Sequence, residues 1–320
     1  MIPSSIQKKH AIVFGGCGFV GRNLITALAH DDWTITVLTR RPHRHRDLLV
    51  FPNLKVIECH DFSHRSIESF VQSADTVVNL IGILNASKGN SFQRIHAQIP
   101  ADIAQACLNN DARRLVHIGS LGANPDAPSE YLRSKASGQQ AVLNSGSEGL
   151  DCIVIRPSVI FGPDDSFSQK FAQLLRLSKW FFPLVCPNAK MQPVFVDDVI
   201  RAIVHAMSAQ TLDTRVVDLA GPEVLTLRQI VATIDKLCGS RHQIIGLNDS
   251  LSMMLARFAQ LVPSQPITAD NIRSLRQPNV LEGEIPAPFG KQASGFEETA
   301  KSWLRSPKDS FNALRTHAGR

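Results

Sequence analysis

The sequence predicts an α/β protein built on a doubly wound parallel sheet, with a small mixed lobe in its C-terminal part. Three observations predict this class. Short apolar segments alternate with helical patterns through the first half of the chain. These segments are rich in Val and Ile and apolar on both faces, which is typical of strands covered by helices on both sides. The first of them runs directly into three closely spaced glycines and a helical pattern.

The alternation gives each predicted element its place in the chain. Strands are expected at residues 11–14, 34–39, 55–59, 76–81, 114–119 and 152–155. Helices are expected between them at residues 19–30, 65–73, 91–109 and 131–144. Because strands and helices alternate at these lengths, the sheet should be parallel, and ligands should bind beyond the carboxyl ends of its strands.

The glycine-rich stretch at residues 12–21 is the first candidate site. Gly15 would allow a sharp turn with a positive φ, Gly18 a close approach to a pyrophosphate, and Gly21 close packing of helix on strand. The first amides of the helix and its positive dipole end would then hold phosphates. These amides belong to Phe19, Val20 and Gly21. The alternative is a turn between strand and helix that binds no ligand.

The remainder of the chain predicts a late strand at residues 216–219 and helices at 167–177, 197–207, 225–237 and 291–305. We therefore expect residues 1–160 to form a nucleotide-binding domain, rejoined by segments from about 190–240. Residues 161–190 and 240–320 would form the smaller lobe. The apolar, proline-broken stretch 179–187 could line a pocket for an apolar substrate or pack in the core. The amphipathic stretch 250–262 could cover its own lobe, touch a membrane surface or bind a partner.

Composition narrows the function classes. The chain has 320 residues, is 43% hydrophobic and carries a net charge of only +6, which does not argue for nucleic-acid binding. Its six cysteines lack zinc-ligand spacing, so we expect no metal and a reducing compartment. Residues 1–9 have no apolar signal region, and no apolar run approaches the roughly 18 residues of a membrane span. A cytoplasmic protein is expected, with the inner face of the membrane as the alternative location and peripheral contact at most.

Arginines follow the second predicted strand, where a carboxylate would bind the ribose hydroxyls of NAD. Arg40 and Arg41 instead suit a 2′-phosphate, which guanidinium groups bind through paired hydrogen bonds. The sequence therefore favours NADP(H) over NAD(H), and the alternative is a solvated basic loop.

Two further loops follow predicted strands. Asp61 could accept a hydrogen bond from adenine with Phe62 beside the ring, or it could cap the next helix. After the fourth strand, Leu80, Ile81 and Gly82 would lie beside the cofactor ribose, since the glycine leaves room there.

Tyr131, the only tyrosine in the chain, precedes Lys135 by four residues. On a helix these positions share a face, so both side chains can project into one site. A nearby ammonium lowers the pKa of a phenol, which would suit Tyr131 to donate or accept a proton at a carbonyl. Ser120, after the fifth strand, could hydrogen-bond the substrate oxygen, or it could tighten a turn.

These motifs resemble those of the short-chain dehydrogenase/reductase superfamily: Gly15-x-x-Gly18-x-x-Gly21 together with Tyr131-x-x-x-Lys135. The stretches at 155–163, 193–199 and 219–222 resemble its extended and atypical branch, the NAD-dependent epimerase/dehydratase-like proteins. Within that branch, residues 131–136 and 192–194 look most like the nucleotide-binding accessory subunit of respiratory complex I and its bacterial relatives. The spacing from Ser120 to Tyr131 is short compared with sugar-nucleotide epimerases.

The resemblance implies a Rossmann-type fold that binds NADP(H). It implies Tyr131 as acid/base, Lys135 on the nicotinamide ribose and Ser120 on the substrate, with Pro157 and Val159 beside the nicotinamide. One hypothesis is an oxidoreductase acting on a carbonyl or alcohol of a small molecule, with an apolar or quinone-like (ubiquinone-type) substrate. The other is a non-catalytic, NADPH-holding accessory or assembly protein of complex I or a quinone-related complex.

Overall fold

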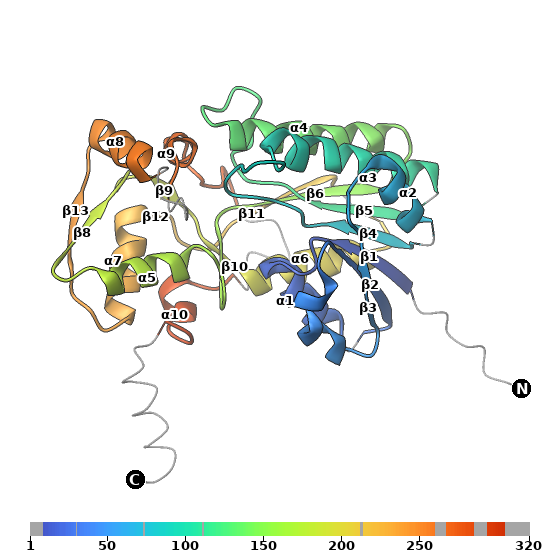
Figure 1. The fold of residues 1–320 in the computed structure, drawn as a ribbon, viewed down its shortest axis with the longest axis horizontal. Helices are drawn as coiled ribbons and strands as arrows, with labels where there is room; N and C mark the ends of the chain where they lie inside the picture. The colour runs from blue at the N-terminus through green and yellow to red at the C-terminus, as the bar shows by residue number, and fades with distance from the viewer. Residues whose placement is uncertain are drawn as a thin grey trace, which may run out of the picture. The chain divides into compact units, whose positions relative to one another are not determined.

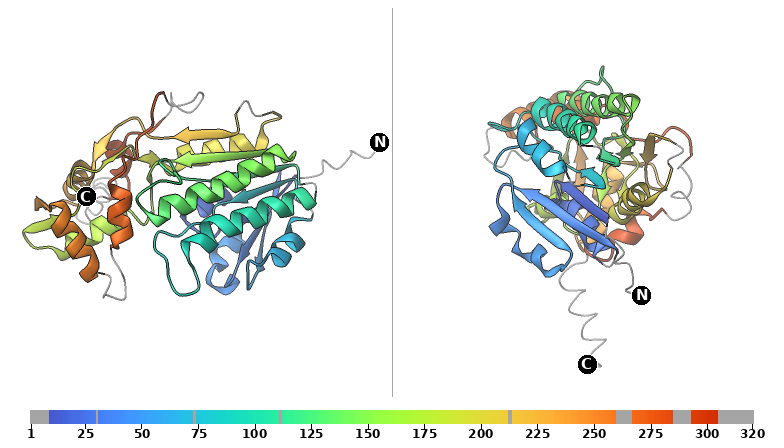
Figure 2. Two further views of the ribbon diagram at one scale, coloured as in Figure 1. Left: turned by 90° about the horizontal axis from the view of Figure 1, so that it is seen from above. Right: turned by 90° about the vertical axis from the view of Figure 1, so that its right-hand side faces the viewer.

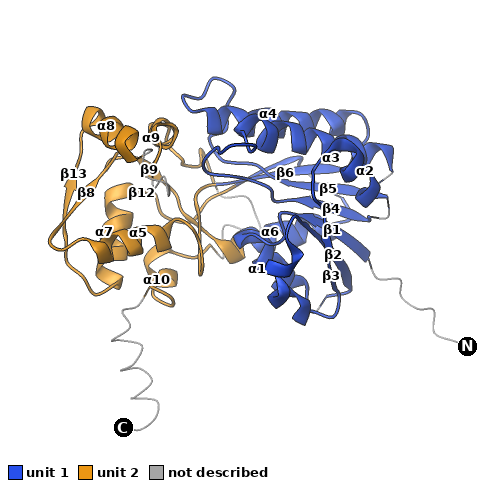
Figure 3. Cartoon of the chain, in the orientation of Figure 1, with its two compact units in different colours: residues 1–157, 199–218 blue, residues 158–198, 219–320 orange. Residues whose placement is uncertain are grey.

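The structure is a computed structural model, and it describes residues 9–29, 31–72, 74–110, 112–211, 214–259, 267–284 and 293–304. The chain divides into two compact units (Figure 3). Unit 1 comprises residues 1–157 and 199–218, and unit 2 comprises residues 158–198 and 219–320. Each unit is described by itself below.

Unit 1 is built on a seven-stranded sheet in the order β11-β6-β5-β4-β1-β2-β3. Its strands are β1 (Lys9–Phe14), β2 (Trp33–Thr39), β3 (Leu54–Glu58), β4 (Thr76–Asn79), β5 (Arg114–Ile118), β6 (Cys152–Pro157) and β11 (Val216–Leu219). Neighbours among β1 to β6 pair in parallel, and Val13 of β1 lies between Val37 and Val78 in register. The predicted doubly wound parallel sheet is confirmed.

Helices cover both faces of this sheet (Figures 1 and 2). On one face lie α2 (His64–Val71), α3 (Ile99–Asn109) and α4 (Glu130–Ser147), and on the other α1 (Phe19–Leu28) and α6 (Val196–Ser208). Two short helices, η1 (Pro42–Arg44) and η2 (Arg46–Val50), follow β2. This two-sided cover explains why the central strands read as apolar on both faces.

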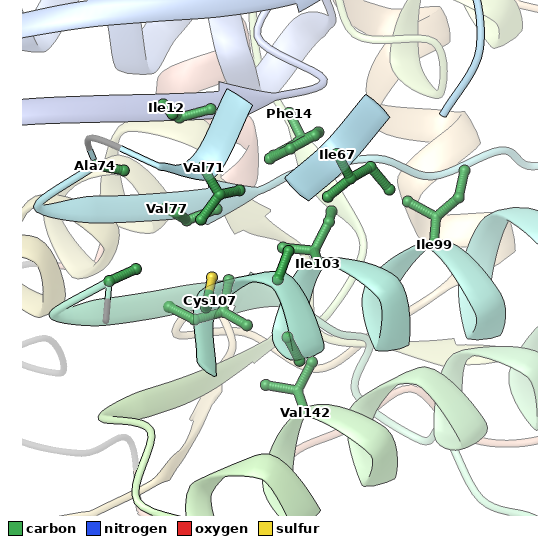
Figure 4. Close-up of a cluster of buried hydrophobic side chains, with 14 of the residues drawn as sticks. Ile12, Phe14, Ile67, Val71, Ala74, Val77, Ile99, Ile103, Cys107 and Val142 are labelled. Atoms are coloured by element: carbon green, nitrogen blue, oxygen red, sulfur yellow. The ribbon is translucent and has the colours of Figure 1, made fainter. Parts of the chain in front are cut away.

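One hydrophobic cluster of unit 1 lies between the sheet and the α2–α4 layer (Figure 4). Phe14 and Val77 from the strands meet Ile67, Ile103 and Val142 from the three helices, and each is completely buried. Burying a side chain of this size stabilises the fold by roughly 1.5–3 kcal/mol. The core therefore fixes the strands whose carboxyl ends carry the candidate site.

The helix predicted at residues 91–109 differs from expectation. Its first part is a π-helix, η3 (Gln93–Gln98), and only the second part is the α-helix α3. Pro100 lacks the amide that would donate to the carbonyl of His96 four residues earlier, so regular α-helical bonding is broken there. Gly138 of α4 lets η3 come close, because a Cβ atom on it would lie 1.8 Å from the His96 carbonyl oxygen.

Unit 2 contains three two-stranded pairings, β7–β10, β9–β12 and β8–β13, together with five helices within its described residues. Its strands are β7 (Ile160–Phe161), β8 (Phe181–Leu184), β9 (Lys190–Met191), β10 (Val194–Phe195), β12 (Leu225–Thr226) and β13 (Gln243–Gly246). Its helices are α5 (Ser168–Leu177), α7 (Leu227–Leu237), α8 (Asp249–Ala259), α9 (Ala269–Leu275) and α10 (Phe296–Ala300). Thr226 begins α7 with a capping box.

Unit 2 also contains the apolar stretch 179–187, the amphipathic stretch 250–262 and the last predicted helix. In the 179–187 stretch, Phe182 and Leu184 are buried in the core, whereas Trp180 and Phe181 are exposed. The amphipathic stretch forms α8, with Met254 and Phe258 exposed, and its predicted end at 260–262 lies outside the described residues. The outer residues of the helix expected at 291–305 also lie outside them. Among the helices of the described ranges, none has the length and apolarity to cross a membrane.

Candidate functional site

The glycine turn between β1 and α1 has the form that the sequence predicts. Gly15 has a φ of +80°, and a Cβ atom on it would lie 2.9 Å from the carbonyl carbon of Leu80. A Cβ atom on Gly21 would lie 2.5 Å from the Cα of Gly16. Gly18 is the N-cap residue of α1, and no side-chain hydrogen bond is made at this cap. The turn therefore fits the pyrophosphate of a dinucleotide, which needs bare backbone and a helix N-terminus.

The basic loop after β2 folds back toward this turn. Arg22 of α1 hydrogen-bonds the Cys17 carbonyl with its Nε at 3.1 Å and pairs with the carboxylate of Asp47. Arg40 and Arg41 are exposed, and the Arg40 Nη1 lies 3.5 Å from Asn90 Oδ1. These two guanidinium groups thus remain accessible next to the end of β2.

The Asp61 carboxylate takes part in capping α2. It accepts hydrogen bonds from the hydroxyls of Ser66 at 2.6 Å and Ser63 at 3.1 Å, and Ser63 is the N-cap residue. These hydrogen bonds, that of Ser66 foremost, hold the pKa of Asp61 below its ordinary value. The Phe62 ring packs on Phe14 with centroids 6.2 Å apart. Ser63 rather than Asp61 is thus the N-cap of α2, and Asp61 supports it through these bonds while its carboxylate stays exposed.

The loop after β4 is held by two side-chain acceptors. The Ile81 amide donates to Asn79 Oδ1 at 3.1 Å, and the Ile83 amide donates to His96 Nε2 at 3.0 Å. The segment Leu80 to Gly82, predicted to line the cofactor ribose, is fixed between these two bonds. A Cβ atom on Gly82 would meet only His96 Nε2 within 4 Å, at 3.8 Å.

The structure brings Tyr131 and Ser120 together. Ser129 caps the start of α4 by accepting from the Leu132 amide at 3.2 Å, which places Tyr131 in the first turn. The side chains of Tyr131 and Ser120 are hydrogen-bonded. The Ser120 amide donates to Gln139 Oε1 at 2.8 Å, so α4 also fixes the backbone of the serine.

Lys135 lies one turn further along α4 and is buried. Its Nζ donates to the Ile118 carbonyl at the end of β5, 2.7 Å away. Burial lowers the pKa of Lys135 to about 8. The lysine is therefore anchored to the sheet edge that also carries Ser120.

The expected lowering of the Tyr131 pKa by Lys135 is not seen. Burial raises the pKa of Tyr131, and the hydrogen bond from Ser120 opposes this only in part. Burial, and after it the charge of Lys135, lowers the pKa of both His96 and His117. Desolvation of the phenolate by burial is therefore the largest effect on the pKa of Tyr131.

Three polar residues of this site were missed by the sequence reasoning: Asn79, His96 and His117. Asn79 Nδ2 donates to His117 Nδ1 at 3.1 Å, and both residues are 1% exposed. Among the described residues, His117 Nε2 has no hydrogen-bond partner. A signal was present, since Asn79 and His117 are polar residues at the carboxyl ends of otherwise apolar strands.

Pro157 and Val159, predicted beside the nicotinamide, fall in different units. The Pro157 carbonyl accepts from the Leu121 amide at 2.9 Å within unit 1. The Val159 amide donates to Asn279 Oδ1 at 2.9 Å within unit 2.

The comparisons with known proteins agree with this geometry. Residues 11–220 match the model of the NAD dependent epimerase/dehydratase family. A mouse relative, NADH dehydrogenase [ubiquinone] 1 alpha subcomplex subunit 9, mitochondrial, is 29% identical over 98% of this chain and 82% of its own length. The ceramide reductase of Caulobacter vibrioides is 26% identical over 74% of this chain and 73% of its own length.

The fold is also that of solved epimerases. The UDP-N-acetylglucosamine 4-epimerase from Methanobrevibacter ruminantium M1 superposes with a TM-score of 0.67 at 17% identity, over 97% of this chain and all of that one. With a family match over residues 11–220 and a matching sheet, this chain belongs to the NAD dependent epimerase/dehydratase family.

Proposed function

We propose that this protein is an NADP(H)-dependent oxidoreductase that acts on a carbonyl or alcohol. The observation that carries the proposal is the hydrogen-bonded pair of Ser120 and Tyr131, with Lys135 on the same face of α4, in the unit that holds the glycine turn. A proton donor and a second hydroxyl at one sheet edge suit reduction of a carbonyl. The reductase among the relatives supports an enzyme of this class.

The chain's own residues have distinct roles in this proposal. Bound NADP(H) would supply or accept the hydride. Tyr131 Oη would give its proton to the carbonyl oxygen during reduction, or take one from the alcohol during oxidation. Ser120 would hydrogen-bond the same oxygen and hold it in line with Tyr131. Lys135 would bind the nicotinamide ribose.

The preference for NADP(H) over NAD(H) rests on Arg40 and Arg41. Both are exposed beside the end of β2, and β2 ends in Thr39 rather than in a carboxylate. The turn of Gly15, Gly18 and Gly21 and the start of α1 would hold the pyrophosphate, as the bare backbone there suggests.

A fluorescence titration with NADPH and with NADH tests this assignment. Arg40→Glu should weaken NADPH binding by about tenfold to a hundredfold and leave NADH binding unchanged, because it removes a charge-assisted hydrogen bond. Arg113→Glu is the matched control, because Arg113 is also exposed but lies just before β5, at the amino ends of the parallel strands rather than at their carboxyl ends. Equal loss in both variants, or tighter binding of NADH than NADPH, would contradict the NADP(H) assignment.

The reaction is tested with Tyr131→Phe. Turnover of apolar aldehydes, ketones and quinones with NADPH should fall by roughly 10²-fold or more, with NADPH binding kept. Ser137→Ala, an exposed change on the same helix, should retain activity. Full activity of Tyr131→Phe would rule out the acid/base role.

A second candidate is a non-catalytic, NADPH-holding accessory or assembly protein of a respiratory complex. The mouse complex I subunit favours it, since the similarity runs through 98% of this chain. In this role the protein would lie at the inner face of the membrane, bound to its partner complex. Tyr131→Phe would then support assembly of the respiratory complex as well as the wild type does, whereas Arg40→Glu would not. Loss of assembly in Tyr131→Phe alone would favour the enzyme.

A further inference from the structure

His96 connects three segments of the candidate site in unit 1. It lies in the π-helix η3 and is 1% exposed. Its Nε2 is 3.0 Å from the Ile83 amide and its Nδ1 is 3.0 Å from Ser134 Oγ. Its ring meets the Tyr131 ring edge-on, with centroids 5.3 Å apart and planes at 87°. The side chain of this π-helix residue therefore contacts both the loop after β4 and the helix α4 that carries Tyr131.

The hydrogen bonds fix the protonation state of His96. A backbone amide can only donate, so Nε2 must accept from Ile83 and the ring proton of the neutral imidazole is on Nδ1. Nδ1 then donates to Ser134, whose hydroxyl donates to the Tyr131 carbonyl at 2.8 Å. This chain of bonds runs from the Ile83 amide to the backbone of Tyr131. Burial and the charge of Lys135 lower the pKa of His96 to about 3, so it stays neutral.

Phe92 completes the packing around Tyr131. Its ring stacks on His96 at 5.5 Å and meets the Tyr131 ring edge-on at 5.9 Å. Phe92 offers no side-chain hydrogen bond, so it shares the packing role of His96 but not the polar one. Packing and hydrogen bonding at Tyr131 can therefore be separated by experiment.

We propose that His96 is a positioning residue for Tyr131: its two hydrogen bonds fix the tyrosine against the loop at residues 80–83. The inference rests on the proposed function, in which that loop lines the cofactor and Tyr131 moves the proton. Binding of the cofactor at the loop would then be transmitted to the tyrosine through the Ile83 amide, His96 and Ser134. His96 does not touch the reacting atoms in this role.

The single tyrosine makes the test direct, because tyrosinate absorbance reports Tyr131 alone and the three tryptophans do not titrate. We would compare wild type, His96→Leu, His96→Gln and Phe92→Leu by pH-jump absorbance, recorded before the protein unfolds. His96→Leu removes both hydrogen bonds of the imidazole, so Tyr131 should no longer be held in its half-buried position and the midpoint should shift toward the ordinary value of about 10. His96→Gln keeps an acceptor at the Nε2 position and should restore most of the wild-type midpoint.

The proposal is overturned if His96→Leu titrates like the wild type, or if Phe92→Leu shifts the midpoint as far. Should the leucine variant fail to fold, His96→Asn replaces it, since asparagine reaches the Nδ1 position but not the Ile83 amide. A wild-type titration in that variant would also overturn the proposal. With substrate, we expect His96→Leu to lower kcat about tenfold and leave the NADPH Kd within about twofold. The titration needs no nucleotide, so failure to bind NADPH would refute the proposed function and leave the test of His96 intact.

Discussion

Gly138→Ala should destabilise the protein, although alanine is the better helix former. Gly138 lies within α4, where replacing glycine by alanine ordinarily stabilises a helix by about 1 kcal/mol. Here the new Cβ atom would lie 1.8 Å from the His96 carbonyl oxygen and 3.3 Å from Pro100 Cγ. A close carbon–oxygen contact needs about 3.3 Å, so η3 and α4 must separate by about 1.5 Å.

Moving η3 away from α4 costs free energy through disturbed packing and through a lost hydrogen bond. Overpacking of a dense interior costs about 1–3 kcal/mol. A shift of this size also breaks the 3.0 Å bond between His96 Nδ1 and Ser134 Oγ, which joins η3 to α4, and a buried unpaired polar group costs about 1–3 kcal/mol. After subtracting the gain in helix propensity, we expect a net loss of about 1–5 kcal/mol.

Urea unfolding followed by far-ultraviolet circular dichroism measures this loss. Ser137→Ala is the matched control, since Ser137 is the exposed neighbour on the same helix and its change should alter stability by less than about 0.5 kcal/mol. If Gly138→Ala were as stable as the control or more stable, η3 would not lie against α4 as described. The account of how His96 reaches Tyr131 would then be wrong.

Three further outcomes are expected. The hydrogen bond to Asp235 raises the pKa of the buried His242 side chain. The pair should therefore stabilise the fold fully below about pH 6.5, and this stabilisation should be lost as the pH rises through the pKa of His242 in the folded protein. In urea unfolding at a series of pH values, Asp235→Asn should abolish this loss of stability with rising pH. Lys135 has a lowered pKa of about 8, so between about pH 8 and 10.4 the unfolded state binds more protons than the folded state and stability should rise with pH. Lys135→Met should remove that rise in the same assay. An unchanged slope of stability against pH would refute the assignment of the rise to Lys135. Asp165 is 2% exposed, and its carboxylate accepts hydrogen bonds from the amides of residues 162, 167 and 168. Asp165→Ala should therefore lower the free energy of unfolding by about 2–4 kcal/mol. The neighbouring change Asp164→Gly is the control and should not lower it, because Asp164 has a φ of +66°, which glycine adopts readily.

The strands and the glycine turn were predictable because local pattern decides them. Strands such as β2 and β5 are buried along almost their whole length, and their short runs of Val, Ile and Leu indicate this in the sequence. Gly15 was predictable for a similar reason, since a turn with positive φ directly after a strand needs glycine. These features need only neighbouring residues in the sequence.

The π-helix and the two histidines were not predictable in this way. η3 depends on Pro100 together with Gly138, which lies 38 residues away and shows its purpose only when α4 is packed against it. His96 and His117 each have partners from other strands or helices, so their spacing in the sequence gives no periodic signal. The pKa of Tyr131 was predicted in the wrong direction, because the sequence shows the lysine four residues away but not the burial that outweighs it.

The raised pKa of Tyr131 bears on whether the site favours reduction or oxidation. Burial raises the pKa of Tyr131, so in the protein alone the phenol is protonated at neutral pH. A protonated tyrosine is ready to give a proton to a carbonyl oxygen, which favours reduction, whereas oxidation of an alcohol would first require the phenol to lose its proton. The positive charge of an oxidised nicotinamide would favour that loss, and a reduced one would not. The titration of Tyr131 with NADPH and with NADP⁺ should therefore differ, with the lower midpoint in the presence of NADP⁺; equal midpoints would mean that the tyrosine does not lie beside the nicotinamide.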